Sequence, residues 1–141
     1  MEILISNDME ELGKLAEALR AFAEENGLDS AISGKLVVCL DELATNVISY
    51  GGPKSPEDRT RITVAVDGRV LRASIEDAGA AFNPLIRPDP DVTGDIEARG
   101  VGGLGIFLVK KMMDGVEYER RGNRNILRMF KSLETGRKSE S

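Results

Sequence analysis

The spacing of apolar residues changes partway along this chain, and this change limits the folds that the chain can adopt. Between residues 9 and 48 they recur at intervals of three and four, which is typical of amphipathic helices. Between residues 60 and 75 they alternate with other residues, as in strands that bury one face, and Asp67-Gly68 separates the two runs as a hairpin signal. The chain therefore needs both helices and paired strands.

These patterns predict the order of the elements. We expect a strand over residues 2–5, helices over about 9–26 and 29–50, strands over 60–67 and around 71–75, a helix over about 104–112, and a hairpin of 116–121 with 125–133. Because the strands fall mainly in hairpins, the expected fold class is α+β. Its form is a two-layer α/β sandwich in which helices pack on one face of a mixed, mostly antiparallel sheet.

The length and the loops indicate one domain. A chain of 141 residues suits a single core, so we assign residues 1–133 to one domain and residues 134–141 to a polar, disordered tail. Residues 83–100 are rich in proline and acidic residues and follow no sustained period. A long loop of this kind is expected to be functional, such as a lid over a site.

The composition excludes several kinds of function. A formal charge of −5 argues against nucleic acid as a partner, and no histidine is present for a histidine-based catalytic or metal site. The single cysteine, Cys39, lies among apolar residues and is expected in a helix core. No apolar stretch reaches the ~20 residues of a membrane span, and the acidic N-terminus differs from a signal peptide. We therefore expect a cytoplasmic protein without membrane contact.

Four residues near the ends of predicted elements are candidates for a binding site. Glu42 and Asn46 are four residues apart in the second helix and share one of its faces, although a solvated polar face also explains this pair. Asp77 continues the buried register of Ile75 to the end of its strand, where its carboxylate needs a partner. Gly79 allows the close approach of a flat ligand, and an Asx turn explains Asp77 equally well.

A glycine-rich run from Arg99 to Gly105 opens the third predicted helix. Glycines at a helix N-terminus expose N–H donors and let phosphate oxygens approach the positive end of the helix dipole, while a flexible hinge is the other interpretation. The run formally spells G-x-G-x-x-G from Gly100. Because a proline-rich loop rather than a strand precedes it, a Rossmann dinucleotide-binding unit is excluded.

Three sequence boxes, taken in order, resemble those of the GHKL family of ATP-binding domains. Residues 41–48 (DELATNVI) are similar to its N-box, residues 77–82 (DAGAAF) to its D-x-G-x-G-F box, and residues 102–109 (GGLGIFLV) to its second glycine box. The glycine box and the short lid are most similar to those of bacterial anti-sigma-factor serine/threonine kinases. The resemblance covers nearly the whole chain and implies the Bergerat-type ATP-binding fold, with ATP and Mg²⁺ as cofactors.

The resemblance also implies a role for each candidate residue. Glu42 is the expected general base toward a serine or threonine hydroxyl, and Asn46 is the expected ligand of Mg²⁺. Asp77 is expected to accept a hydrogen bond from the adenine amino group. The remaining expected nucleotide contacts are Gly79, Phe82, Arg99, Gly102, Gly103, Leu104 and Gly105.

Four positions depart from the pattern of the family. Ala81 replaces the second glycine of the D-x-G-x-G box, and Tyr50 stands where many relatives have histidine. Asn125 occupies the place of a threonine in the last hairpin, and Arg99 lies further from the glycine box than the γ-phosphate arginine of relatives.

Two functions are compatible with these features. The first is an ATP-dependent serine/threonine protein kinase that acts as an anti-sigma factor, phosphorylating a STAS-type antagonist and capturing a sigma factor. The second is a non-catalytic, nucleotide-gated regulator of a partner-switching pathway, which Ala81 and Tyr50 favour. A histidine-kinase catalytic domain fits less well, because this chain has no dimerisation helix that carries histidine. The resembling kinases also imply a homodimer formed through the first helix, although the apolar stripe of that helix equally suits core packing.

Overall fold

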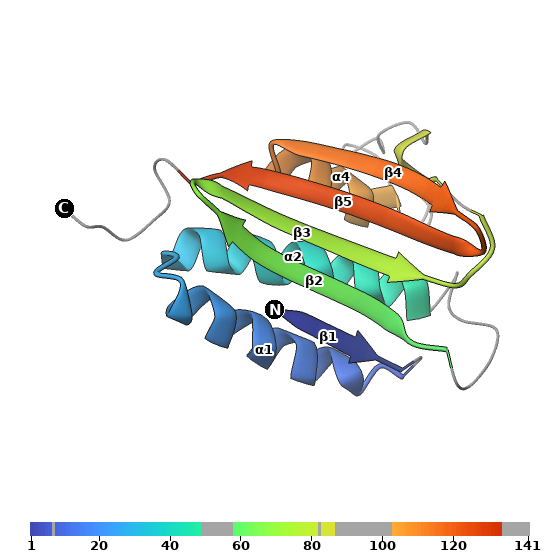
Figure 1. The fold of residues 1–141 in the computed structure, drawn as a ribbon, viewed down its shortest axis with the longest axis horizontal. Coiled ribbons are helices and arrows are strands. Elements are labelled where there is room, and N and C mark those ends of the chain that lie inside the picture. The colour runs from blue at the N-terminus through green and yellow to red at the C-terminus, as the bar shows by residue number, and fades with distance from the viewer. Residues whose placement is uncertain (7, 49–57, 82, 87–102, 134–141) are drawn as a thin grey trace.

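The computed structural model describes residues 1–6, 8–48, 58–81, 83–86 and 103–133, with residues 103 and 104 described by their backbone alone. Within these ranges the chain forms β1 (Glu2–Ile5), α1 (Glu11–Glu25), α2 (Ser30–Asn46), β2 (Thr60–Asp67), β3 (Val70–Asp77), η2 (Pro84–Ile86), α4 (Gly103–Met112), β4 (Gly115–Arg121) and β5 (Arg124–Ser132). The helices and strands follow in the predicted order (Figure 1). The predicted tail and most of the predicted lid lie outside the described residues.

The described strands form one sheet in the order β1-β2-β3-β5-β4, and every neighbouring pair is antiparallel. The α+β class is thus confirmed, but this sheet is antiparallel throughout rather than mixed. The path of the chain explains the direction of β2, because β1 and α2 both end at the right of Figure 1 and β2 runs back from that side. β3 and β5 pair along their length, so Asp77 faces Asn125 at one end of the sheet.

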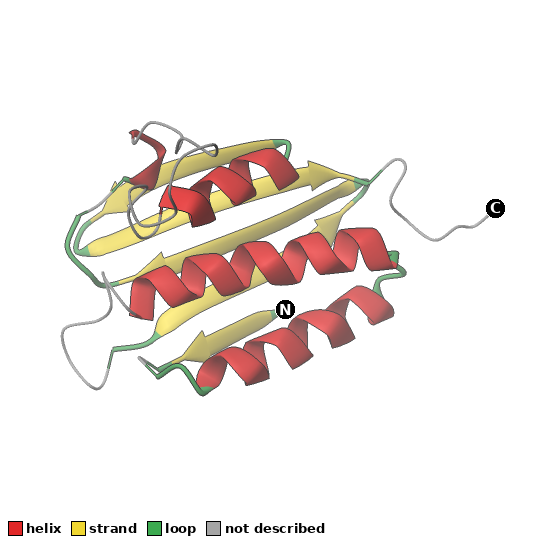
Figure 2. Cartoon of the chain, turned by 180° about the vertical axis from the view of Figure 1, so that it is seen from behind, coloured by secondary structure: helices red, strands yellow, loops and turns green. Residues whose placement is uncertain are grey.

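The helices α1, α2 and α4 lie side by side on one face of the sheet, with α2 in the middle (Figure 2). α2 begins close to the predicted residue 29, where the side chain of Asp29 caps the helix by accepting a hydrogen bond from the backbone N–H of Ile32 at 2.9 Å. α1 begins at Glu11, slightly later than the predicted start at about residue 9. None of the described helices is both long and apolar enough to cross a membrane.

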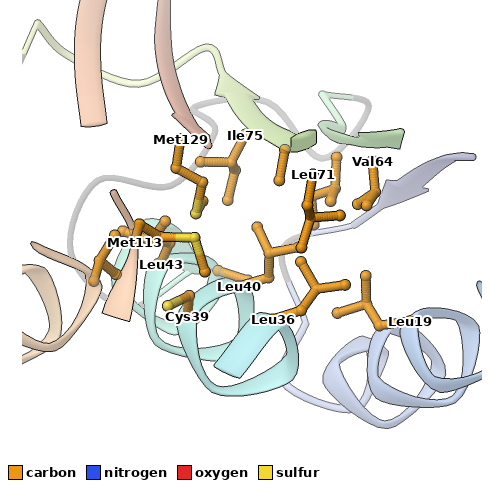
Figure 3. Close-up of a cluster of buried hydrophobic side chains, with 14 of the residues drawn as sticks. Leu19, Leu36, Cys39, Leu40, Leu43, Val64, Leu71, Ile75, Met113 and Met129 are labelled. Atoms are coloured by element: carbon orange, nitrogen blue, oxygen red, sulfur yellow. The ribbon is translucent and has the colours of Figure 1, made fainter. Parts of the chain in front are cut away.

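The core lies between α2 and the sheet (Figure 3). Leu36 and Leu40 of α2 are fully buried there, against strand residues such as Leu71 and Ile75. Cys39 is buried as well, and burial raises the pKa of its thiol to about 11. A thiol with such a pKa stays protonated at neutral pH, so Cys39 is a core residue, as predicted.

The opposite face of the sheet carries charged side chains. Glu119 of β4 pairs with Arg128 of β5 at 2.8 Å, and Glu76 of β3 pairs with Arg124 of β5. Residues of this face alternate along each strand with those that face the helices. The sheet therefore buries mainly the face under the helices, which explains the alternation seen in the sequence, although Ile126 of β5 is buried on the charged face.

The central position of α2 yields a stability prediction. Leu40→Ala removes a fully buried side chain and should lower the free energy of unfolding by about 2–5 kcal/mol. The matched control is Val38→Ala on the same helix, where the side chain is 38% exposed, and its effect should stay within about 0.5 kcal/mol. Denaturant unfolding measures both, and equal effects would contradict the described packing of α2.

Candidate functional site

The last turns of α2 present Glu42 and Asn46 on one face of the helix. Both side chains are partly buried, while Leu43 between them points into the core. The α-helix ends at Asn46, and Val47 and Ile48 continue it as a π-helical turn. The end that the sequence predicted, at about Tyr50, lies outside the described residues. The spacing of four residues thus places a carboxylate and an amide side by side at a helix end.

Gly105 of α4 lies directly against this pair. A Cβ atom at Gly105 would lie 3.2 Å from Asn46 Nδ2, 3.2 Å from Glu42 Oε2 and 3.5 Å from Glu42 Cβ. A side chain at this position would press on both polar groups, so the absence of a side chain allows α4 to approach α2 closely here. The structure therefore brings the predicted glycine box and the predicted N-box together.

Among the described residues of the glycine run, Gly103 and Gly105 lie inside the first turn of α4, because the helix begins at Gly103. The backbone N–H groups of a first helical turn have no partner within the helix, and they mark the positive end of its dipole. Gly103, Leu104 and Gly105 therefore supply N–H groups that suit an anion. Phe82, Arg99 and Gly102 lie outside the described residues, so their roles stay predictions.

Asp77 ends β3 with a buried carboxylate. The residue is 7% exposed, and its Oδ1 accepts hydrogen bonds from the backbone N–H of Gly79 at 2.8 Å and from Asn125 Nδ2 at 3.2 Å. The first of these bonds is the Asx turn that the sequence left open as an alternative. No donor from the described residues reaches Oδ2, so the other half of the carboxylate remains available to a ligand.

Burial raises the pKa of Asp77, because removal from water disfavours the charged form. Four neighbours lower the pKa but do not cancel the effect of burial: the donors Gly79 and Asn125, and the nearby guanidinium groups of Arg124 and Arg120. A buried carboxylate that keeps one oxygen without a donor costs stability. Such a group is more characteristic of a binding site than of a structural contact.

Asn125 is a site residue whose role the sequence did not reveal. It is 8% exposed, and its Nδ2 also donates to the backbone oxygen of Ala80 at 2.9 Å. Its Oδ1 accepts hydrogen bonds from Tyr118 Oη at 2.5 Å and from the Arg120 guanidinium at 3.2 Å. Arg120 donates as well to the backbone oxygen of Gly79 at 2.8 Å, so two strands hold the turn that follows Asp77.

A signal for Asn125 was nevertheless present in the sequence. Asn125 shares the alternation of Leu127 and Met129, which are both buried under the helices. A polar side chain in a buried register needs partners. That observation could have pointed to Asn125 in the same way as it pointed to Asp77.

The two groups of polar residues lie at the same end of the molecule. The C-terminal ends of α2 and β3 and the turn between β4 and β5 all lie at the right of Figure 1. The contact of Gly105 with Glu42 and Asn46 brings the start of α4 to the same end. This end therefore combines a buried acceptor, a helix start whose N–H groups suit an anion, and a carboxylate–amide pair.

Two relatives are similar to this chain in sequence. The serine/threonine-protein kinase BtrW of Bordetella bronchiseptica is 27% identical over 92 residues, which cover 65% of this chain and 65% of that protein. The serine-protein kinase RsbW of Listeria monocytogenes is 26% identical over 110 residues, which cover 75% of this chain and 69% of that protein. The similarity thus spans about two thirds of the length of each relative.

Two solved structures have the same fold. The structure of the RsbU and RsbW domains of a Mycobacterium tuberculosis protein has a TM-score of 0.64 at 14% identity, and the match covers 94% of this chain and 31% of that chain. The Acinetobacter baumannii histidine kinase AdeS has a TM-score of 0.55 at 15% identity, and the match covers 96% of this chain and 68% of that chain. At these identities the likeness concerns the fold alone.

The family is established by the sequence as a whole. The model of the histidine kinase-like ATPase domain matches residues 5–131, a range that includes Glu42, Asn46, Asp77 and Gly105. The fold, the site at the ends of α2 and β3, and the kinase relatives agree with this match. The chain belongs to the histidine kinase-like ATPase domain family.

Proposed function

We propose that this protein is an ATP-dependent serine/threonine protein kinase that acts as an anti-sigma factor. The observation that carries this proposal is the contact of Gly105 with both Glu42 and Asn46, since it joins a candidate base to the anion-binding start of α4. The two named relatives, a serine/threonine-protein kinase and a serine-protein kinase, support the same class of reaction.

The adenine base is proposed to bind at the end of β3. Asp77 Oδ2 has no donor among the described residues, and the exocyclic amino group of adenine is a donor of matching chemistry. Gly79 follows in the Asx turn and presents no side chain to the flat ring. Phe82 is proposed to add an apolar contact to the base.

The phosphates are proposed to bind at the start of α4. The backbone N–H groups of Gly103, Leu104 and Gly105 suit phosphate oxygens, and Gly102 and Arg99 are proposed to extend this site. Gly105 lies close to Asn46 and Glu42, so the proposed phosphate site adjoins both side chains.

Asn46 is proposed to hold Mg²⁺ through its amide oxygen, a hard ligand that magnesium accepts. Among the described residues no three carboxylate or thiolate side chains gather into a metal site, so phosphates and waters would complete the coordination. When bound, Mg²⁺ neutralises charge on the transferring phosphate. Asn46 lies beside Gly105 through its Nδ2 atom, which brings the amide group, though not its oxygen, to the edge of the proposed phosphate site.

Glu42 is proposed to act as the general base of phosphoryl transfer. It accepts the proton of a serine or threonine hydroxyl while the hydroxyl oxygen bonds to the γ-phosphorus of ATP. The bond from that phosphorus to the bridging oxygen of the β-phosphate breaks, which leaves ADP and a phosphorylated side chain. The acceptor is proposed to be a STAS-type antagonist, whose release on phosphorylation leaves a sigma factor bound by a homodimer of this chain.

Replacing Glu42 tests the catalytic assignment. Glu42→Gln keeps the size of the side chain but removes the base, so phosphate transfer should fall by about 100-fold or more while ADP binding changes little. The measurements are radiolabel transfer to the antagonist and calorimetry with ADP. The matched control is Glu17→Gln, the same change at an exposed position of α1, which should transfer phosphate normally. Full phosphate transfer by Glu42→Gln would contradict the role of Glu42, whereas full sigma-factor regulation without any transfer would favour the nucleotide-gated regulator.

Gly105 tests the contact between α4 and α2. Gly105→Ala places a methyl group 3.2 Å from Glu42 Oε2 and Asn46 Nδ2, so these side chains must shift by a few tenths of an ångström. We expect phosphate transfer to fall by about tenfold or more, because small displacements of reacting groups are costly, and the melting temperature to change little. In the control Gly34→Ala on α2, the new methyl group meets no atom within 4 Å, so activity should be retained. Normal transfer by Gly105→Ala would contradict the described contact.

Asp77→Asn separates binding from stability. The amide oxygen of the new side chain takes the place of Oδ1 as the acceptor for Gly79 and Asn125. The amide NH₂ then points toward the ligand, where it faces the adenine amino group donor to donor, so ADP affinity should fall by about tenfold or more. Because the folded pKa of Asp77 is raised, the wild type loses stability as pH rises from 3.8, the unfolded value, to the folded value. Asp77→Asn has no titrating group at this position, so it does not lose stability in this pH window.

The variant should therefore gain unfolding free energy relative to the wild type as pH increases through that window. Denaturant unfolding at several pH values checks the stability, and calorimetry with ADP checks the affinity. Asp67→Asn, at an exposed position of β2, should change neither property. Unchanged ADP binding by Asp77→Asn would exclude Asp77 from the nucleotide site.

A further inference from the structure

The orientation of the Asn125 amide is determined by its neighbours. A guanidinium group only donates hydrogen bonds, so the Asn125 atom that faces Arg120 at 3.2 Å must be the amide oxygen. The Tyr118 hydroxyl donates to the same oxygen at 2.5 Å. The amide NH₂ is thereby directed toward Asp77 Oδ1 and the Ala80 backbone oxygen.

This orientation determines what Asp77 can do. Oδ1 receives two donors, the backbone N–H of Gly79 and the amide of Asn125, and Oδ2 receives none from the described residues. A proton taken up by Asp77 would therefore reside on Oδ2, the oxygen that is left for a ligand. The donor from Asn125 lowers the pKa of Asp77 and so opposes this uptake.

The consequence concerns the ligand that the site accepts. An ionised Oδ2 only accepts hydrogen bonds, so it favours a purine with an amino group at position 6 and repels the oxygen of a 6-oxo purine. A protonated Oδ2 donates, and the repulsion of the 6-oxo purine is lost. The choice between the two bases thus depends on the groups that keep Oδ2 unprotonated: the donors Gly79 and Asn125 and the nearby guanidinium groups of Arg124 and Arg120. Of the two donors that bond to Asp77, Asn125 is the one that acts through its side chain.

We propose that Asn125, oriented by Tyr118 and Arg120, is a positioning residue that keeps Asp77 a pure acceptor and thereby sets the preference for 6-amino over 6-oxo purine nucleotides. The inference rests on the proposed function, in which Asp77 binds the base of ATP. It adds three residues that act on the nucleotide through Asp77: Asn125 on β5, and Tyr118 and Arg120 on β4.

The test compares ADP and inosine diphosphate by calorimetry from about pH 6 to about pH 8. Asn125→Leu keeps a similar volume but removes the donor to Asp77. We expect the wild type to prefer ADP across this range, and the preference of the variant to fall about fivefold or more at the acidic end and to recover at the alkaline end. A merely structural role of Asn125 would lower the affinity for both nucleotides equally at every pH.

Two further variants complete the test. Tyr118→Phe removes one donor to Asn125 without touching Asp77, and it should shift the pH dependence in the same direction by a smaller amount. Asn123→Leu makes the same change in the exposed turn between β4 and β5, and it should behave as the wild type. If Asn125→Leu does not fold, the result for Tyr118→Phe decides the matter.

The failures of the two proposals are distinguishable. If Asn125→Leu prefers ADP over inosine diphosphate as strongly as the wild type at every pH, the role of Asn125 is overturned while the nucleotide site stands. If Asn125→Leu does not fold, the same result for Tyr118→Phe overturns that role. Equal binding of ADP by the wild type and Asp77→Asn overturns the proposed function itself.

Discussion

The packing of α2 against the sheet is the interaction on which the rest of the structure depends. The fully buried side chains of Leu36 and Leu40 set the rotation of the helix, with α1 and α4 on either side of it. In this rotation the face that carries Glu42 and Asn46 meets Gly105. A change of register by one residue would turn the helix by about 100° and carry both polar groups away from α4. The hydrophobic core therefore positions the polar residues that we assign to chemistry.

The same end of the molecule is where the fold departs from maximal stability. Asp77 holds a buried carboxylate whose pKa is raised, although an amide would satisfy the Asx turn with Gly79 equally well. The start of α4 carries Gly103 and Gly105, which are poor helix formers. Each of these choices is unfavourable for the folded chain alone, and each lies at the proposed nucleotide site. Costs of this kind, concentrated at one site, are expected where a structure serves binding.

The sequence predicted the elements well, because their signals are local. The alternation in β2 and β3 and the helical spacing of α1 and α2 need only neighbouring residues, and the predicted pairs Glu42–Asn46 and Asp77–Gly79 are local as well. The hairpins predicted the antiparallel pairs β2–β3 and β4–β5, whereas the direction of the pairs β1–β2 and β3–β5 depends on the path of the chain. The bond of Asn125 to Asp77 joins residues 48 positions apart, so it depends on the register of β3 and β5. The contact of Gly105 with Glu42 was likewise implied only by family resemblance, because it depends on how α4 packs on α2.

The central claim is that the end of β3 and the start of α4 form one nucleotide site. Amide hydrogen exchange of the whole chain, measured with and without ADP and Mg²⁺, tests this claim directly. We predict that bound nucleotide slows exchange in two separate segments at once, the turn around Gly79 and Ala80 and the first turn of α4. The turn between β2 and β3, which lies at the opposite end of the sheet (Figure 1), should exchange as before. Binding that protects only one of the two segments, or that protects the turn between β2 and β3 instead, would contradict the account.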